Sequence, residues 1–144
     1  MNYQERLRNL AELKRKYINN LENAKKQKTA KRREKIQIYL PQIEKVCKSF
    51  AEATGWQYEE SEGDISEIHI MSCFIKSDRP YKYKQWITYE IALREDLILI
   101  YKWRNYSGPG RNWADYDARV IDFAEFSEDK LTRMLEDWIK EDFL

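Results

Sequence analysis

The sequence predicts an α+β fold with a long basic N-terminal helix, a second helix, an antiparallel meander sheet of four or five strands, and a C-terminal helix. Two observations predict this order. Apolar residues recur every three or four positions before residue 55 and after residue 127, which is the helical period. Between these stretches they alternate with polar residues in short runs separated by turn-forming residues, which is typical of strands joined as hairpins.

The first helix is predicted over residues 3–35, with an apolar stripe along one side. Steps of three and four return to the same side of a helix, so one stripe collects Tyr3, Leu7, Leu10, Tyr17, Leu21 and Ala24. Lys14 fills the remaining position and weakens the seam of a coiled coil, for which three heptads are already short. Three arrangements remain open: packing on the chain's own domain or fraying, a homodimer through residues 3–24, or docking on a different protein.

A second helix is expected to begin at Pro41. Proline suits the first helical position because its missing N–H would have no partner there. The same proline predicts a break or a bend between the two helices, and Gly55 supplies a C-terminal stop. The apolar face of this helix comprises Ile43, Val46, Cys47 and Phe50.

The strands are expected at residues 56–59, 65–75, 85–93, 97–104 and 118–126. Residues 61–64 and 94–96 are predicted turns, and residues 105–117, which contain a Gly-Pro-Gly sequence, are a predicted loop. Ser127 can cap a final helix whose first turn holds two acidic residues. The core-facing residues of that helix are Leu131, Leu135, Trp138 and Ile139.

Charge divides the chain into two parts of opposite sign. Residues 1–48 hold fourteen Lys/Arg and five Asp/Glu, a balance of +9, whereas residues 49–144 hold twelve and twenty, a balance of −8. This division predicts a basic helical arm (residues 1–35) and an acidic α+β domain (residues 36–144). The sharpest run has seven basic residues in eleven, and we call it the basic segment: Lys25, Lys26, Lys28, Lys31, Arg32, Arg33 and Lys35. It predicts phosphate contacts with nucleic acid; a solvated helical face and contacts with an acidic protein surface are the alternatives.

A second basic group is expected at one end of the sheet. Alternate connections of a meander lie at the same end, so the tip around residues 76–84 joins the loop at 104–117. Cations beside aromatic rings are typical of single-strand binding and of protein-binding hot spots. The residues that we assign to nucleic acid here are Lys82, Lys84, Arg104, Arg111 and Trp113. Ordinary hairpin tips are the alternative.

The acidic domain supports a different hypothesis, in which the chain is a protein-binding adaptor or inhibitor. The domain would then occupy a basic surface of a partner by imitating the charge of nucleic acid. The C-terminal helix would provide the contact through Glu128, Asp129, Glu136, Asp137, Glu141 and Asp142.

No motif in the sequence indicates a reaction, so we expect a non-enzymatic protein without catalytic residues, cofactor or metal. A single His69 near Glu67 lacks the partners of an acid–base set. The two cysteines, Cys47 and Cys73, are far apart in sequence and are expected to be reduced and buried. No apolar run approaches the length of a membrane span, and no secretory signal is recognised, so we expect no membrane partner and a cytoplasmic location.

Overall fold

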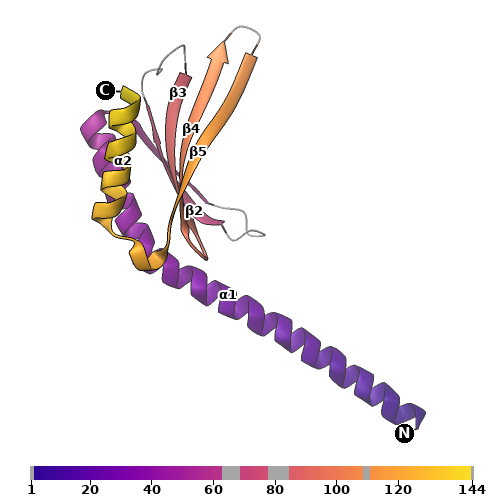
Figure 1. Ribbon diagram of the computed structural model, residues 1–144. Coiled ribbons are helices and arrows are strands. Elements are labelled where there is room, and N and C mark those ends of the chain that lie inside the picture. The colour runs from indigo at the N-terminus through magenta and orange to yellow at the C-terminus, as the bar shows by residue number, and fades with distance from the viewer. Residues whose placement is uncertain (1, 63–68, 78–84, 109–110, 144) are drawn as a thin grey trace. The chain divides into compact units, whose positions relative to one another are not determined.

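Helix α1 (Tyr3–Thr54) opens the computed structural model, which describes residues 2–62, 69–77, 85–108 and 111–143 (Figure 1). The helix begins with a capping box. The Asn2 side chain accepts a hydrogen bond from the Glu5 N–H at 2.9 Å, and the Asn2 N–H donates to the Glu5 carboxylate at 3.3 Å. The helix ends before Gly55, whose φ of 72° is the left-handed conformation that glycine adopts without strain, as expected for a stop.

Of the break or bend expected at Pro41, the break is wrong, because the two predicted helices form one element with Pro41 inside it. A proline here removes the hydrogen bond that the Gln37 carbonyl would accept. Both Gln37 and Pro41 are exposed, so water can take the missing place. Burial of Leu40 and Ile43 on the other side of the helix favours continuity.

The chain divides into two compact units, Met1–Glu34 and Lys35–Leu144. In the first unit, every described residue from Asn2 to Lys31 is exposed. The second unit contains the sheet and the core, and its helices are the remainder of α1 and helix α2 (Glu128–Phe143). These two helices lie on one face of the sheet (Figure 1).

Five strands form one antiparallel sheet in the order β1-β2-β3-β4-β5. They are β1 (Gln57–Glu62), β2 (His69–Lys76), β3 (Gln85–Arg94), β4 (Ile98–Gly108) and β5 (Arg111–Ile121). The α+β class and the meander are therefore confirmed. Ser61 and Glu62, predicted as part of a turn, belong to β1, and the predicted strand residues 65–68 lie outside the described residues.

The loop expected at residues 105–117 is wrong. Strands β4 and β5 continue through it and pair from Ile98↔Ile121 to Gly108↔Arg111. Cross-strand contacts explain this, because the Arg104 guanidinium bonds to Asp115 and Asp117 on β5 at 2.7 and 2.8 Å. The predicted last strand is also displaced, since β5 ends at Ile121 and a 3₁₀ helix, η2 (Phe123–Glu125), follows.

The core lies between the sheet and the two helices. Odd-numbered residues of β3 face the helices, and Ile87, Tyr89 and Ile91 are fully buried. Helix α2 begins where predicted, because the Ser127 hydroxyl accepts a hydrogen bond from the Lys130 N–H at 3.0 Å. The other fully buried large side chains of the core are Ile43, Ile75, Leu93, Ile98, Ile100, Ile121, Leu131, Leu135 and, at 2%, Trp138.

Candidate functional site

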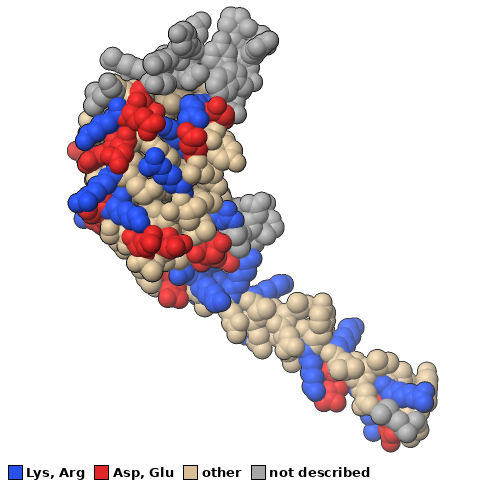
Figure 2. All heavy atoms as spheres, in the orientation of Figure 1, with Lys and Arg blue, Asp and Glu red and all other residues tan. Residues whose placement is uncertain are grey.

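The basic segment lies on α1, where its side chains are largely accessible. Lys25, Lys26, Lys28, Lys31 and Arg33 are exposed, and none of these five has an ion pair within the described part of the chain. Figure 2 shows basic side chains gathered along α1 beside a stretch of uncharged ones. These five cations are therefore available to an anion from outside the chain.

The spacing of the basic segment places like charges next to each other. Lys28 and Arg32, and likewise Lys31 and Lys35, are four residues apart and so are neighbours on the helix surface. Each such pair destabilises an isolated helix by roughly 0.2–0.5 kcal/mol. A bound polyanion would convert this repulsion into attraction.

Lys35 differs from the rest of the basic segment because aromatic rings contact it. Its ammonium lies 4.0 Å from the ring centroid of Phe123 and 5.5 Å from that of Tyr39. These are cation–π distances. Lys35 is the first residue of the second unit, and its ammonium is therefore packed against aromatic rings of that same unit.

The second predicted basic group is only partly described. Lys82 and Lys84 lie outside the described residues. Arg111 and Trp113 belong to β5, but their side chains also lie outside the description. Arg104 is on β4 rather than in a loop, and its charge is matched by the two carboxylates of β5.

The carboxylates beside Arg104 change its titration. The hydrogen bond to Asp117 is the largest cause that raises the pKa of Arg104. The same bond holds the pKa of Asp117 below its usual value. Arg104 is therefore paired within the sheet, and its assignment to nucleic acid stays a prediction.

The acidic surface expected on α2 is smaller than predicted. Asp142 is only 8% exposed, and its carboxylate accepts hydrogen bonds from the Lys102 ammonium at 2.9 Å and the Tyr89 hydroxyl at 2.7 Å. The sequence held a signal for this burial, because Asp142 continues the stripe of Leu131, Leu135 and Trp138. Asp142 therefore bonds within the core rather than presenting its charge at the surface of α2, and its assignment to protein binding stays an untested prediction.

The five other acids of α2 divide into two groups. Glu128 pairs with Lys45 at 3.2 Å, and Asp129 pairs with Arg133 at 3.1 Å. The exposed acids without an ion pair among the described residues are Glu136, Asp137 and Glu141. Basic and acidic side chains are interspersed over the body in Figure 2.

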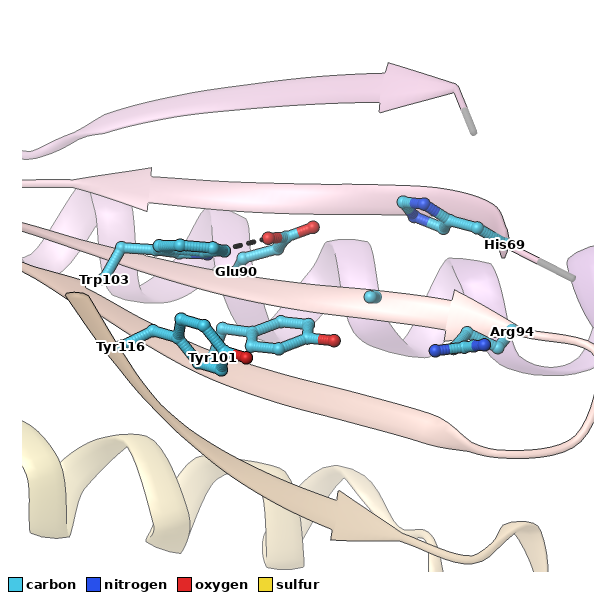
Figure 3. Close-up of a pocket in the computed structure, with 7 residues that line it drawn as sticks. His69, Glu90, Arg94, Tyr101, Trp103 and Tyr116 are labelled. Atoms are coloured by element: carbon cyan, nitrogen blue, oxygen red, sulfur yellow. Dashed lines mark hydrogen bonds between the residues drawn. The ribbon is translucent and has the colours of Figure 1, made fainter. Parts of the chain in front are cut away.

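A hollow lies on the face of the sheet opposite the helices, which we call the open face. Its volume is about 250 Å³ and its lining comprises His69, Glu90, Ala92, Arg94, Tyr101, Trp103 and Tyr116 (Figure 3). The small side chain of Ala92 explains the depression, because its neighbours on β3 are the larger Glu90 and Arg94. We call this site the aromatic hollow.

Three rings from β4 and β5 form one wall of the aromatic hollow. The centroids of Trp103 and Tyr116 are 4.7 Å apart, and those of Tyr101 and Tyr116 are 5.5 Å apart with planes at 77°. These are favourable aromatic geometries. The rings are not all covered, since Tyr116 is 54% exposed.

A chain of hydrogen bonds runs along the floor of the aromatic hollow. The Trp103 indole N–H donates to Glu90 Oε1 at 2.8 Å, and the Ser72 hydroxyl donates to Glu90 Oε2 at 2.6 Å. Ser72 Oγ lies 2.7 Å from Nε2 of His69. Because the only hydroxyl hydrogen of Ser72 is directed to Glu90, this contact requires the His69 tautomer in which Nε2–H donates to Ser72 Oγ. Glu90 is only 9% exposed, and burial of a carboxylate is costly unless it is hydrogen-bonded. The bonds from Trp103 and Ser72 offset this cost and fix the orientation of the carboxylate.

Sequence reasoning missed the aromatic hollow, apart from noting His69. A signal was present on β4, where Ile98 and Ile100 alternate with Tyr101 and Trp103. Both faces of that strand are therefore rich in large apolar residues, whereas a sheet with one solvated face normally shows polar residues on that side.

The two cysteines are free, buried and close together. A hydrogen bond from the Cys47 thiol lowers the pKa of Cys73, and the same bond, with burial, raises the pKa of Cys47. The Tyr58 hydroxyl lies 3.4 Å from Cys73 Sγ, and burial is the largest cause that raises the pKa of Tyr58. The two thiols are therefore neighbours in the fold, although the cysteines are far apart in sequence.

Neither helix that the structure describes has the length and apolar character needed to cross a membrane. Among the described His, Cys, Asp and Glu side chains, no group of three is placed to hold a metal ion. Comparison of the chain with protein-family models, with curated proteins and with solved structures finds no match.

Proposed function

We propose that this protein is a non-enzymatic nucleic-acid-associated accessory protein whose basic segment binds phosphates. One observation carries the proposal: five exposed cations without an ion pair among the described residues lie within nine consecutive positions of α1. These positions extend about 12 Å along the helix, a length over which duplex DNA presents several phosphates. Lysine and arginine contacts of this kind provide affinity and position without reading sequence.

The proposal predicts a specific salt dependence. If all five cations neutralise phosphates, the logarithm of the binding constant falls with the logarithm of salt at a slope of about −4.5. Between about 50 and 200 mM salt the affinity then decreases about 500-fold. Fluorescence anisotropy with labelled single- and double-stranded DNA and RNA measures this slope.

A matched pair of variants tests whether the basic segment is responsible. The test variant replaces the five cations by glutamine: Lys25, Lys26, Lys28, Lys31 and Arg33. The control variant removes the same charge from the same helix at Arg6, Arg8, Lys14, Arg15 and Lys16. The test variant should reduce the slope to near zero, whereas the control should retain most of it. Equal losses in both variants would attribute binding to net charge and contradict the proposal.

The alternative function, a protein-binding adaptor or inhibitor, retains a smaller surface. Its support is the exposed group of Glu136, Asp137 and Glu141 on α2. Absence of binding to every nucleic acid at low salt would favour this alternative. A triple Glu/Asp→Lys variant at these positions should then abolish capture of the partner, while deletion of residues 1–34 should not.

The apolar stripe suggests a second copy of the chain as an additional partner. Its exposure is high for large apolar side chains: Tyr3 74%, Leu7 48%, Leu10 62%, Tyr17 64% and Leu21 47%. Covering these five side chains on each of two copies contributes roughly 10 kcal/mol before the cost of association. Sedimentation equilibrium tests this homodimer, and a Leu10→Lys variant should be monomeric.

The cytoplasmic location stays a prediction.

A further inference from the structure

We propose that the aromatic hollow binds an unpaired nucleobase, with guanine preferred. The inference deepens the proposed function and rests on it, because the base would belong to the nucleic acid that the protein binds. It is carried by different residues in a different unit of the chain.

Glu90 has more acceptor capacity than the protein uses. A carboxylate offers about four lone-pair sites, and Trp103 and Ser72 each occupy one. Both donors come from the protein, so the carboxylate is fixed in orientation before a ligand arrives. A ligand with two adjacent N–H groups can use the remaining sites. Guanine has this arrangement on its Watson–Crick edge, and adenine does not.

Arg94 provides the complementary charge on the other side of the hollow. In Figure 3 the Arg94 guanidinium and the Glu90 carboxylate extend toward one another along β3. Their α-carbons are about 13 Å apart, because four residues of a strand separate them. Arg94 Nε is buried without a hydrogen-bond partner among the described residues, and it lies 3.9 Å from Asp96 Oδ1. Guanidinium groups bind the O6 and N7 acceptors of guanine.

The aromatic wall and the volume fit a single planar ring system. Tyr101, Trp103 and Tyr116 present ring surface to a cavity of about 250 Å³, which is below the range of pockets for drug-sized molecules. Stacking on aromatic side chains is the usual way in which proteins hold unpaired bases. Carboxylate, guanidinium and rings together therefore match a base with N–H donors on one edge and acceptors on another.

In the test, each of four ribonucleoside 5′-monophosphates is titrated into the full chain, and binding is monitored by two-dimensional ¹H–¹⁵N NMR. The indole N–H of Trp103 is the reporter because it donates directly to Glu90. GMP should shift this resonance with a Kd in the millimolar range, and AMP, CMP and UMP should bind more weakly. Inorganic phosphate is the control for charge at Arg94.

Three variants assign the binding to the aromatic hollow. Tyr116→Ala should weaken the binding of all four nucleotides about tenfold through lost stacking, and the variant should still fold because Tyr116 is exposed on an edge strand. Glu90→Gln should weaken GMP about tenfold and leave AMP unchanged, because glutamine replaces an acceptor oxygen by a donor. Val120→Ala, on the same face of β5 but outside the hollow, should change nothing.

Two outcomes would overturn the inference. One is an unmoved Trp103 resonance with every nucleotide up to about 10 mM, a concentration that detects even millimolar affinity. The other is an equal shift with inorganic phosphate alone. Equal binding of GMP and AMP would refute the guanine preference. The glutamine variant of the basic segment separates the two proposals, because it should lose the salt-dependent binding of polymers and keep the binding of GMP.

Discussion

Replacing Asp142 by alanine is expected to destabilise the protein more than any other single change to an acidic residue of α2. The Asp142 carboxylate holds the Lys102 ammonium, which is only 3% exposed in its side chain, and it also accepts the Tyr89 hydroxyl. Asp142 lies in the last turn of α2. A negative charge there interacts unfavourably with the helix dipole, so its stabilising role comes from Lys102 and Tyr89.

The magnitude follows from what the substitution leaves behind. Removing one partner of a buried ion pair costs about 3–5 kcal/mol because the other charge stays buried alone. The Tyr89 hydroxyl also loses its acceptor, although this cost overlaps with the first. A loss of about 4 kcal/mol is a large part of the 5–15 kcal/mol that is typical of a domain. It corresponds to a decrease in Tm of about 15 °C for a unit of this size.

Urea unfolding followed by tryptophan fluorescence measures this loss as a change in midpoint at constant slope. Asp137→Ala, an exposed change on the same helix, is the control and should stay within about 0.5 kcal/mol. A Lys102→Met, Asp142→Leu double variant should recover most of the stability, because a buried ion pair is often replaceable by apolar residues. A loss below about 1 kcal/mol in Asp142→Ala would refute the reasoning.

Three further predictions follow from other contacts. Arg104 lowers the pKa of Asp117, so their pair stabilises the protein above the unfolded pKa, and this stabilisation is lost as pH falls through the folded pKa. Arg104→Gln should therefore cost a few tenths of a kcal/mol at pH 6 and progressively less as the pH of the urea titration is lowered into the acid range. Cys47 and Cys73 should resist a thiol reagent in the folded protein and react in urea, and fast labelling without urea would contradict their burial. Pro41→Ala should raise the unfolding free energy by about 1–3 kcal/mol by restoring the helical hydrogen bond; a decrease would show that the helix needs the proline.

The order of elements could be predicted because it depends on local periodicity. The alternation of Ile87, Tyr89 and Ile91 fixes which face of β3 is buried, and Ser127 marks the start of α2. Two errors arose where tertiary contacts override local preference. Pro41 lies inside a helix that burial of its neighbours sustains, and the residues around the Gly-Pro-Gly sequence pair as strands because their side chains bond across the hairpin.

The candidate sites were predictable to different degrees. The basic segment is contiguous, so its charge is visible in the sequence, and helical geometry determines its exposure. The aromatic hollow depends on which side chains of β2, β3, β4 and β5 share a face, and this is fixed only by the strand register. Lys102 and Asp142 are likewise 40 residues apart. For both the aromatic hollow and the Lys102–Asp142 ion pair, the neighbouring sequence does not indicate which distant residues come into contact.

The order of the strands has a consequence for how molecules of this protein meet one another. An open five-stranded sheet leaves β1 and β5 as edges whose backbone could pair with another chain and begin a fibril. Both edges carry carboxylates: Glu59, Glu60 and Glu62 on β1, and Asp115 and Asp117 on β5. Their mutual repulsion keeps the edges of neighbouring molecules apart at neutral pH, and it weakens as acid protonates them. In acid, molecules of the protein should therefore aggregate through these edge strands. Strand β1 should be the more vulnerable of the two, because Arg104 lowers the pKa of Asp117 and so keeps a negative charge on β5 to lower pH.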